Sequence, residues 1–207
     1  MARLLLGALL AAQAASLQAQ PPAPAVAVQS DVDSAAERKR LRDLSACLAE
    51  ARPRWARKTL SYPYLSDAQA SAAATALSGK DTCITRPEAE VTFRTSSLVG
   101  SLAEHFLQTD LRNADFARLT KTLSTLEPLN VTEDFALCVA SRNPAAARDL
   151  SLSEPGSAAE AEAGRKLSAH IEGCTVPGED LKVDMQSLRA LVATALYRGV
   201  SVVLARS

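Results

Sequence analysis

The four cysteines of this chain form two pairs with the same internal spacing. Cys83 follows Cys47 by 36 residues, and Cys174 follows Cys138 by 36 residues. A shift of 91 residues therefore superimposes one pair on the other. The same shift superimposes Ala49 on Ala140, Pro53 on Pro144, Ala56 on Ala147, Arg57 on Arg148 and Ser66 on Ser157. Alanine matches are common in an alanine-rich chain, but matched cysteines, prolines and serines are not, so we predict a tandem repeat.

The repeated core has the pattern C-x-A-x-x-x-P-x-x-A-R, which occurs as CLAEARPRWAR at 47–57 and as CVASRNPAAAR at 138–148. A shift of 90 residues extends the match, with Ser97 on Ser187, Leu98 on Leu188 and Phe106 on Leu196. We therefore predict two similar disulfide-stapled multi-helix units joined by a linking helix. The first unit is expected at 34–109, the linking helix within 110–129 and the second unit at 130–207.

The cysteines are expected to form structural disulfides. Four cysteines allow three pairings, and the repeat selects Cys47–Cys83 and Cys138–Cys174, because the same local fold should close the same loop twice. In the chain-entropy model, closing a loop of this length stabilises the folded state by about 4 kcal/mol. The alternative, reactive or zinc-bound thiols, would need a C-x-x-C motif or closely spaced ligands, and the sequence has neither.

The first nineteen residues are typical of a secretory signal peptide. Arg3 supplies a positive charge, LLLGALLAA at 4–12 is apolar, and the small residues at 13–19 suit cleavage, which we place after Ala19 rather than Ala14 or Ala15. A retained membrane anchor is the alternative, but a spanning helix needs about 20 apolar residues. Residues 20–33 are rich in proline and alanine and are expected to form a flexible linker. We expect an exported protein with no later membrane-spanning segment.

Capping signals and apolar spacing predict an all-α fold. SAAE occurs at 34–37 and at 157–160, and each is a capping box in which serine and glutamate satisfy backbone N–H groups. Ser66 with Gln69 offers the same arrangement. We predict helices at 35–51, 66–79, 96–109, 114–127, 132–142, 157–172 and 185–198, with shorter helical turns that begin at Pro53 and Pro144. VSVVLA at 200–205 is the only candidate strand.

The balanced charge argues against a nucleic-acid-binding protein. The chain has 23 Lys and Arg and 23 Asp and Glu. A nucleic-acid surface needs a basic stripe that displaces counterions. The short run ERKR at 37–40 is interpreted as a solvated helix face. We therefore expect no nucleic-acid partner.

The sequence contains no catalytic or metal-binding motif. His105 and His170 do not occupy equivalent positions in the two units, and we interpret them as partly exposed helical residues. There is no G-x-S-x-G, H-E-x-x-H or glycine-rich phosphate loop. Glu104, Glu133 and Asp134 could supply a pair of catalytic carboxylates, but solvated helix charges are commoner. We expect no cofactor, no metal and no catalytic residue.

Five residues are candidates for contact with a partner. Arg57 and Arg148 recur after the proline of each unit. They either cap helix carbonyls or pair with an acid inside their own unit, or they line a shared groove between the units that meets an acidic partner. Trp55, Tyr62 and Tyr64 have no counterparts in the second unit. Because tyrosine and tryptophan are favoured at interfaces, the loop at 62–64 is a candidate contact surface.

The C-x-A-x-x-x-P core, the S-x-x-E cap and the closing SLRALVATALYR at 187–198 resemble uncharacterised secreted helical proteins of alphaproteobacteria, sphingomonads in particular. The resemblance covers residues 44–198. It implies a bacterial periplasmic or exported protein and brings no activity with it.

Two functional hypotheses follow from these patterns. The first is a non-enzymatic helical-repeat protein that serves as an interaction or scaffolding module in the periplasm or outside the cell and binds another protein. The alternative is a helical enzyme of the cell envelope with Glu104 or Glu133 as general acid or base. That alternative requires two carboxylates that face one cleft.

Overall fold

All regular secondary structure in the described residues is helical. The computed structural model describes residues 35–77, 83, 94–175 and 183–206. The predicted signal peptide at 1–19, the linker at 20–33 and Ser34 of the first capping box lie outside the described residues. The described helices belong to one compact unit, residues 31–207.

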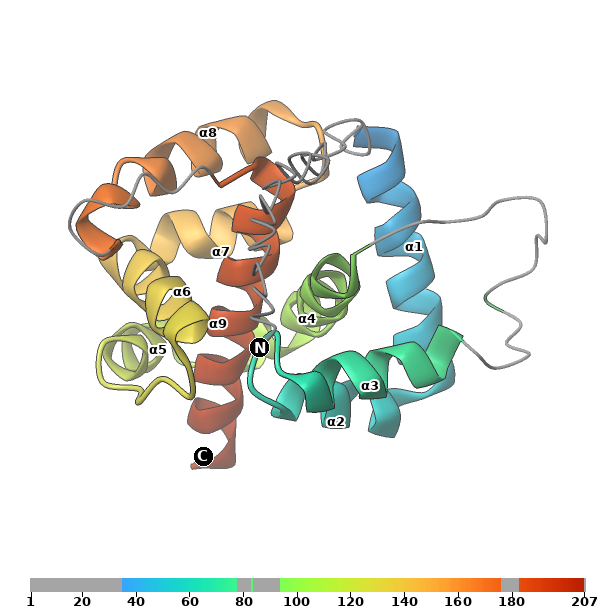
Figure 1. The fold of residues 1–207 in the computed structure, drawn as a ribbon. Coiled ribbons are helices and arrows are strands. Elements are labelled where there is room, and N and C mark those ends of the chain that lie inside the picture. The colour runs from blue at the N-terminus through green and yellow to red at the C-terminus, as the bar shows by residue number, and fades with distance from the viewer. Residues whose placement is uncertain (1–34, 78–82, 84–93, 176–182, 207) are drawn as a thin grey trace, which may run out of the picture. The chain divides into compact units, whose positions relative to one another are not determined.

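The helices follow one another as shown in Figure 1. They are α1 (Ala35–Ala51), α2 (Pro53–Ser61), α3 (Asp67–Leu77), α4 (Thr95–Asn113), α5 (Phe116–Leu123), α6 (Val131–Arg142), α7 (Pro144–Leu152), α8 (Ala158–Ser168), the short 3₁₀ helix η1 (Glu172–Cys174) and α9 (Met185–Ala205). The predicted all-α class is confirmed. Every helix predicted from the sequence has a counterpart, including the two that begin at Pro53 and Pro144.

Several helix ends differ from the prediction, and α8, for example, ends at Ser168 rather than at 172. The candidate strand at 200–205 was wrong, because α9 continues as a helix through Ala205. Val200 and Val203 lie three residues apart on its buried face, and this packing outweighs the preference of valine for strands. Helix α4 extends to Asn113, past the predicted end at 109, and α5 is shorter than the predicted linking helix at 114–127.

Three helices begin with the same pair of side-chain hydrogen bonds. In the first bond, the cap side chain accepts the backbone N–H of the residue three positions later. These bonds run from Gln69 N–H to Ser66 Oγ (3.2 Å), from Glu133 N–H to Asn130 Oδ1 (2.9 Å) and from Glu160 N–H to Ser157 Oγ (3.1 Å). In the second bond, the side chain of that later residue accepts the backbone N–H of the residue before the cap. These bonds run from Leu65 N–H to Gln69 (2.9 Å), from Leu129 N–H to Glu133 (2.6 Å) and from Gly156 N–H to Glu160 (2.6 Å). The second bond therefore reaches one residue earlier than the predicted capping box.

The central helices α4 and α9 make the most extensive contact between any two described helices. In Figure 1, α1, α2 and α3 lie on one side of this pair and α5 to α8 on the other. The two backbones approach closely at Gly100, where an added Cβ would lie 2.5 Å from Ala190 Cα. Small residues at this crossing therefore allow the two longest helices to pack directly on each other.

Helix α9 is long and apolar enough to cross a membrane by length and composition alone. The expectation of no later membrane-spanning segment therefore stays a prediction. Of its most apolar 18-residue window, 67% is buried against the rest of the structure. The core helix of a globular domain has the same properties, and α9 packs against α4, α5, α6 and α7.

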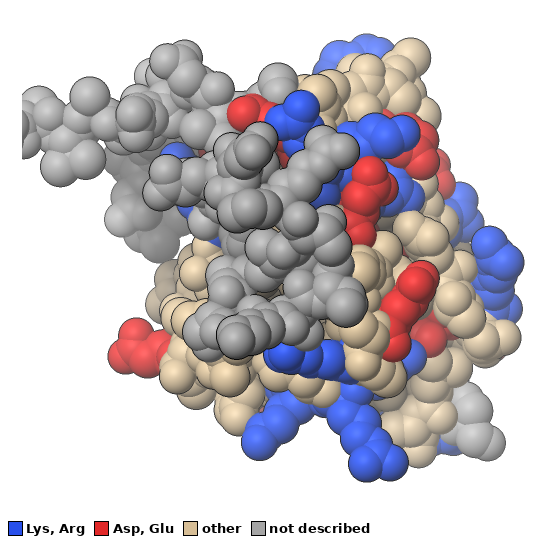
Figure 2. Space-filling model, turned by 90° about the vertical axis from the view of Figure 1, so that its right-hand side faces the viewer, with Lys and Arg blue, Asp and Glu red and all other residues tan. Residues whose placement is uncertain are grey.

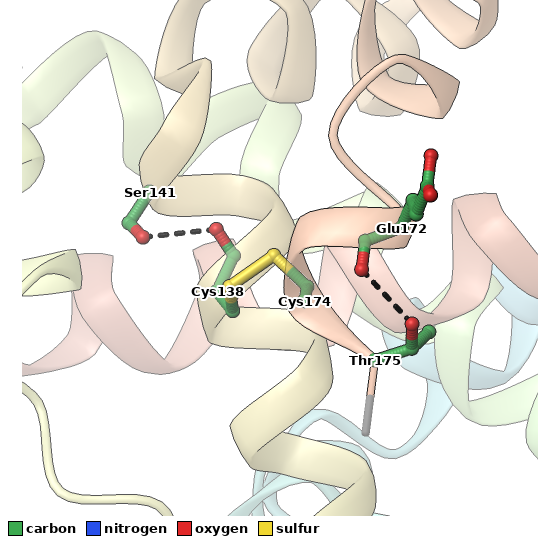
Figure 3. The surroundings of a disulfide bond; sticks show 5 residues. All are labelled: Cys138, Ser141, Glu172, Cys174 and Thr175. Atoms are coloured by element: carbon green, nitrogen blue, oxygen red, sulfur yellow. Dashed lines mark hydrogen bonds between the residues drawn. A yellow bond between two sulfur atoms is a disulfide. The ribbon is translucent and has the colours of Figure 1, made fainter. Parts of the chain in front are cut away.

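Both disulfides have the predicted pairing. Cys47 bonds to Cys83 and Cys138 bonds to Cys174, with Cα–Cα distances of 5.8 and 5.7 Å. Figure 3 shows the second bond, which attaches η1 to α6. Ser141 Oγ donates to the Cys138 carbonyl, and Thr175 Oγ1 donates to the Glu172 carbonyl. Both disulfide partners thus lie in locally hydrogen-bonded helical turns.

We expect the substitution Gly100→Ala to lower the free energy of unfolding by about 1–3 kcal/mol, because the new methyl group would overlap the backbone of α9. At an exposed helical site the same change would stabilise by about 1 kcal/mol through helix propensity. Urea unfolding followed by circular dichroism measures the difference. The control is Gly173→Ala, because a Cβ at Gly173 would meet no atom within 4 Å. Equal behaviour of the two variants would contradict the close approach.

Candidate functional site

A buried arginine joins five structural elements. Arg189 of α9 has a side chain only 2% exposed, and its Nε and Nη2 donate to the two carboxylate oxygens of Glu104 on α4 at 3.0 and 2.9 Å. Its Nη1 donates to Glu160 Oε1 of α8 and to Ser153 Oγ, both at 3.0 Å. Its Nη2 also donates to the Ser153 carbonyl, just after α7. Arg38 of α1 completes the group through Glu160 Oε2 at 2.9 Å.

These five residues, Arg38, Glu104, Ser153, Glu160 and Arg189, form what we call the buried ion network. All five N–H donors of Arg189 have acceptors within it. Its two arginines and two glutamates balance in charge. Burial raises the pKa of Glu104, while its contacts with Arg189 act in the opposite direction. A satisfied buried ion pair of this kind fixes geometry, because loss of one partner leaves an unpaired buried charge.

The glutamates that the sequence suggested as solvated or catalytic are buried and paired. Glu104 is 4% exposed and Glu133 is 6% exposed, so their interpretation as solvated helix charges was wrong. Glu133 Oε2 lies 2.7 Å from Arg198 Nη1 of α9 and also accepts the Leu129 N–H. The two glutamates contact different arginines. Each carboxylate therefore stabilises helix packing at its own place.

Two clefts bounded by described residues do not contain a pair of carboxylates. One cleft, of about 440 Å³, lies between α5 and α6 and has Asp134 as its only acidic lining residue. The other has none. Neither histidine lines either cleft, and His105 packs edge-on against Phe106 with ring centroids 5.3 Å apart. Within the described residues, no three His, Cys, Asp or Glu side chains gather as a metal ion would require.

The second of these clefts, of about 400 Å³, lies where α1, α4 and α7 meet, and we call it the arginine cleft. It is lined by Arg42, Gln108, Leu111, Arg112, Arg148 and Leu152. Arg148, for which lining a groove was one of two alternatives, is one of its walls, and its guanidinium lies 4.9 Å from the centre of the Phe116 ring. Arg148 also pairs with its neighbour Asp149. Arg148 thus pairs with an acid of its own unit and also lines a cleft, so each of its two alternatives describes part of its surroundings.

A second surface carries exposed apolar side chains, and we call it the loop surface. It consists of Leu65, Leu129 and Val131, whose exposed fractions are 52%, 53% and 80%. Asn130 Nδ2 donates to the Tyr64 carbonyl at 2.8 Å, so the loop before α3 and the loop before α6 lie side by side. The three apolar residues flank this single hydrogen bond. Two loops that are 66 residues apart in the chain thereby form one surface.

Leu65 has a left-handed backbone, with φ of 62°. It occupies the third position of a four-residue turn closed by the bond from Ser66 N–H to the Pro63 carbonyl. Glycine is favoured there, and a leucine in this conformation costs about 1–2 kcal/mol. In the turn before α8, Gly156 occupies the corresponding place with φ of 79°. Leu65 therefore occupies a backbone conformation that favours glycine.

The remaining predicted contact residues contribute mainly to the fold. Trp55 is half-buried, and its Nε1–H donates to the Ala72 carbonyl at 2.9 Å, which ties α2 to α3. Tyr64 is 4% exposed, and burial raises the pKa of its hydroxyl. Tyr62 is half-buried and directly follows the last residue of α2.

Arg57 is paired inside the molecule. It lies 3.0 Å from Asp110 on α4, stacks 4.1 Å from the centre of the Phe106 ring and donates to the Tyr197 hydroxyl. The hydrogen bond with Asp110 raises the pKa of Arg57. Its side chain remains 48% exposed. Arg57 does not line the arginine cleft, so the two recurring arginines do not share one groove.

The basic residues of α1 and α2 have different environments. Arg38, expected on a solvated face, is 11% exposed and belongs to the buried ion network, whereas Lys39 and Arg40 are exposed as predicted. Figure 2 views the side where α1, α2 and α3 lie, with basic side chains along the lower edge and both charges mixed above. Exposed basic residues of α2 include Arg54 and Lys58.

No family model, no curated protein and no solved structure matches this chain.

Arg148 and Glu104 were candidates from the sequence, but most other residues of the two surfaces and of the buried ion network were not. Arg189 carried a signal, since it interrupts the apolar run SLRALVATAL of α9, and a charge on an apolar face needs a buried partner. Leu65 carried a weaker signal, because it aligns with Gly156 under the shift of 91 residues. Leu129, Val131 and Arg112 have no distinctive sequence pattern. Tertiary contacts alone bring them to a surface.

We expect Arg189→Met to lower the free energy of unfolding by about 3–5 kcal/mol, because the buried carboxylates of Glu104 and Glu160 would lose their shared partner. Methionine keeps the alkyl chain and removes the charge. The matched control is Arg165→Met on α8, whose exposed pair with Glu162 should contribute less than about 1 kcal/mol. Denaturant unfolding of both variants tests this. A loss as small as that of the control would mean that the buried ion network does not stabilise the fold.

Proposed function

We propose that this chain is a non-enzymatic, exported helical protein that binds another protein through the loop surface. The observation that carries the proposal is the gathering of exposed apolar side chains at that place. Only four large apolar residues in the described part of the chain are exposed, and three of them are Leu65, Leu129 and Val131. Contiguous exposed apolar groups favour association with a partner.

The local backbone supports the same proposal. Leu65 and Leu129 each precede a helix cap, where an apolar residue often packs against the fourth residue of the helix. The fourth residues are Ala70 and Asp134, and neither offers a large apolar side chain. Both leucines stay half-exposed, and Leu65 does so in an unfavourable backbone conformation. An unfavourable local conformation that keeps an apolar side chain at the surface points to a role in binding.

We further propose that the helices form two copies of one unit. Helices α2 and α7 begin and end 91 residues apart, as do α3 and α8, and the two disulfides have the same spacing. Helices α4 and α9 begin 90 residues apart. Gly100 and Ala190 correspond under that shift, and they meet at the helix crossing. Contact between corresponding residues is what a two-fold relation between the copies would produce.

Export to the periplasm or the cell surface is the compartment we propose. Two disulfides are typical of proteins that fold in oxidising compartments. The predicted signal peptide at 1–19 and the resemblance to secreted proteins of alphaproteobacteria agree with it. In such a compartment an exposed apolar surface would meet other exported proteins.

The alternative of a carboxylate enzyme receives no support from the geometry. Glu104 and Glu133 contact different arginines, and neither lines a cleft described above. A general acid or base must reach its substrate within hydrogen-bond distance. A binding role therefore fits the described residues better.

Site-specific photo-crosslinking tests the loop surface. We expect a photoreactive amino acid at Val131, in the full chain exported by an alphaproteobacterium, to give a discrete protein adduct. The double substitution Leu65→Asn and Leu129→Asn should reduce that adduct at least tenfold, because it removes the apolar contact area. Asparagine tolerates a left-handed backbone, so Leu65→Asn alone should leave stability unchanged or raise it by up to about 1 kcal/mol.

The matched control for that experiment is Leu152→Asn, since Leu152 is an exposed leucine outside the loop surface. The adduct should persist in this control at its full yield. Persistence of the adduct in the double variant, or absence of any adduct in the unchanged chain, would contradict the proposed binding surface.

The proposed export is tested by intact mass and a non-reducing peptide map of protein recovered from whole cells and culture medium together. We expect a chain that begins near Gln20, with linked peptides that contain Cys47 with Cys83 and Cys138 with Cys174. Free thiols on a chain that retains residues 1–19 would contradict export. Crossed pairing of the cysteines would contradict the proposed repeat.

A further inference from the structure

We propose that the arginine cleft binds an oxyanion, a phosphate or a carboxylate, that carries a short apolar group. This site lies on α1, α4 and α7, whereas the loop surface lies before α3 and α6. The proposal therefore does not depend on the protein-binding role proposed for the loop surface. The ligand of the arginine cleft would be a small anion, separate from the protein partner of the loop surface.

The charge of the lining residues selects the ligand. Three of the six lining residues are arginines, contributed by three different helices, and none is acidic. The planar guanidinium presents paired N–H donors that match the oxygens of a carboxylate or phosphate. Arg42, Arg112 and Arg148 come from positions far apart in the chain, so only the fold brings these donors to one cleft.

Two of the arginines are held in place by contacts that spare part of their hydrogen-bonding capacity. Arg42 Nη1 donates to the Ser153 carbonyl at 3.2 Å, and its side chain is 14% exposed. Arg148 stacks against Phe116, and its Nε and Nη2 both donate to a single oxygen of Asp149. No described residue accepts from Nη1 of Arg148. Such positioning reduces the conformational entropy that a ligand would have to remove.

The acids that pair with these arginines are exposed and easily displaced. Glu154 lies 3.2 Å from Arg42 with its side chain 69% exposed, and Asp149 is 53% exposed beside Arg148. Ion pairs of this kind contribute less than about 1 kcal/mol, because water screens the charges. An oxyanion that contacts two or three arginines at once can replace them.

The remaining walls favour a ligand with an apolar part. Leu111 and Leu152 line the cleft beside the arginines, and Leu152 is 38% exposed. It is the fourth exposed large apolar residue of the described chain, the only one away from the loop surface. The volume of about 400 Å³ lies in the range of small-molecule sites and far exceeds that of a single phosphate ion.

Isothermal titration calorimetry on the full chain tests the site with three probes. Octyl phosphate should bind, inorganic phosphate should bind more weakly, and octyl glucoside, which has the same apolar chain without charge, should not bind. Arg112→Met and Arg148→Met should each weaken octyl phosphate binding about tenfold or more, because each removes hydrogen bonds to a charged group. Equal binding of octyl glucoside and octyl phosphate would overturn the proposal.

The control variant is Arg54→Met, since Arg54 is an exposed arginine of α2 that does not line the cleft. Its affinity for octyl phosphate should equal that of the unchanged chain. An equal loss in Arg54→Met and in Arg148→Met would mean that general surface charge, rather than the cleft, attracts the probe. That result would overturn the proposal, and the unfolding midpoint of each variant shows whether it is folded.

Vesicle sedimentation distinguishes two sources of the same chemistry. Binding to phosphatidylglycerol vesicles but not to phosphatidylcholine vesicles, with the loss in Arg112→Met and Arg148→Met, would support the site and identify the oxyanion as a lipid headgroup. Binding of octyl phosphate without vesicle binding would support the site and identify a soluble ligand. Absence of both would overturn the site while leaving the proposed role of the loop surface unaffected.

Discussion

The buried guanidinium of Arg189 is the interaction on which the arrangement of the helices depends. It contacts α4, α8 and the end of α7 directly, and it reaches α1 through Glu160. A charge placed in an apolar core is tolerated only when its donors and counter-charges are satisfied, so these elements must meet in one arrangement. Sliding α9 along α4 by one turn would keep apolar residues in contact but would leave Glu104 buried without a partner. The network therefore specifies helix register, which apolar packing alone would leave less defined.

The close approach of α4 and α9 and the buried ion network are two parts of one constraint. Gly100 and Glu104 are one turn apart on α4, while Ala190 directly follows Arg189 on α9. A larger residue at Gly100 would push α9 away and lengthen the hydrogen bonds of Arg189, which are now 2.9 to 3.2 Å long. Small residues thus bring the two backbones together, and the bidentate pair one turn away depends on that distance. The contribution of Arg189 to stability therefore depends on Gly100, whose missing side chain lets α4 and α9 approach closely.

Much of the fold could be predicted because its signals are local. Capping serines, the prolines at 53 and 144 and the spacing of the cysteines each depend on a few neighbouring residues, and the predicted helices and disulfide pairing are present. The sites could not be predicted in the same way. The residues around Glu104 and Glu133 are those of ordinary helices. These two glutamates are buried only because α9 packs against α4 and α6. The exposed valine and leucines of the loop surface meet through one hydrogen bond between distant loops, from Asn130 to the Tyr64 carbonyl, which no local pattern encodes.

Differences between the two proposed copies separate residues that stabilise the fold from residues that a partner could use. Under the shifts that relate the copies, Arg189 corresponds to Val99, so the network exists only once. That difference has a structural reason, because α4 and α9 share a single interface and one buried network is enough to define it. Leu65 corresponds to Gly156, and the turn has a positive φ in both places. At position 156 a Cβ would lie 2.5 Å from Ala35 Cβ, so glycine is needed there, whereas Leu65 is 52% exposed in a conformation that also suits glycine better. The backbone disfavours Leu65, the core does not bury it, and a second apolar loop lies beside it. An external contact explains such a side chain better than stability does.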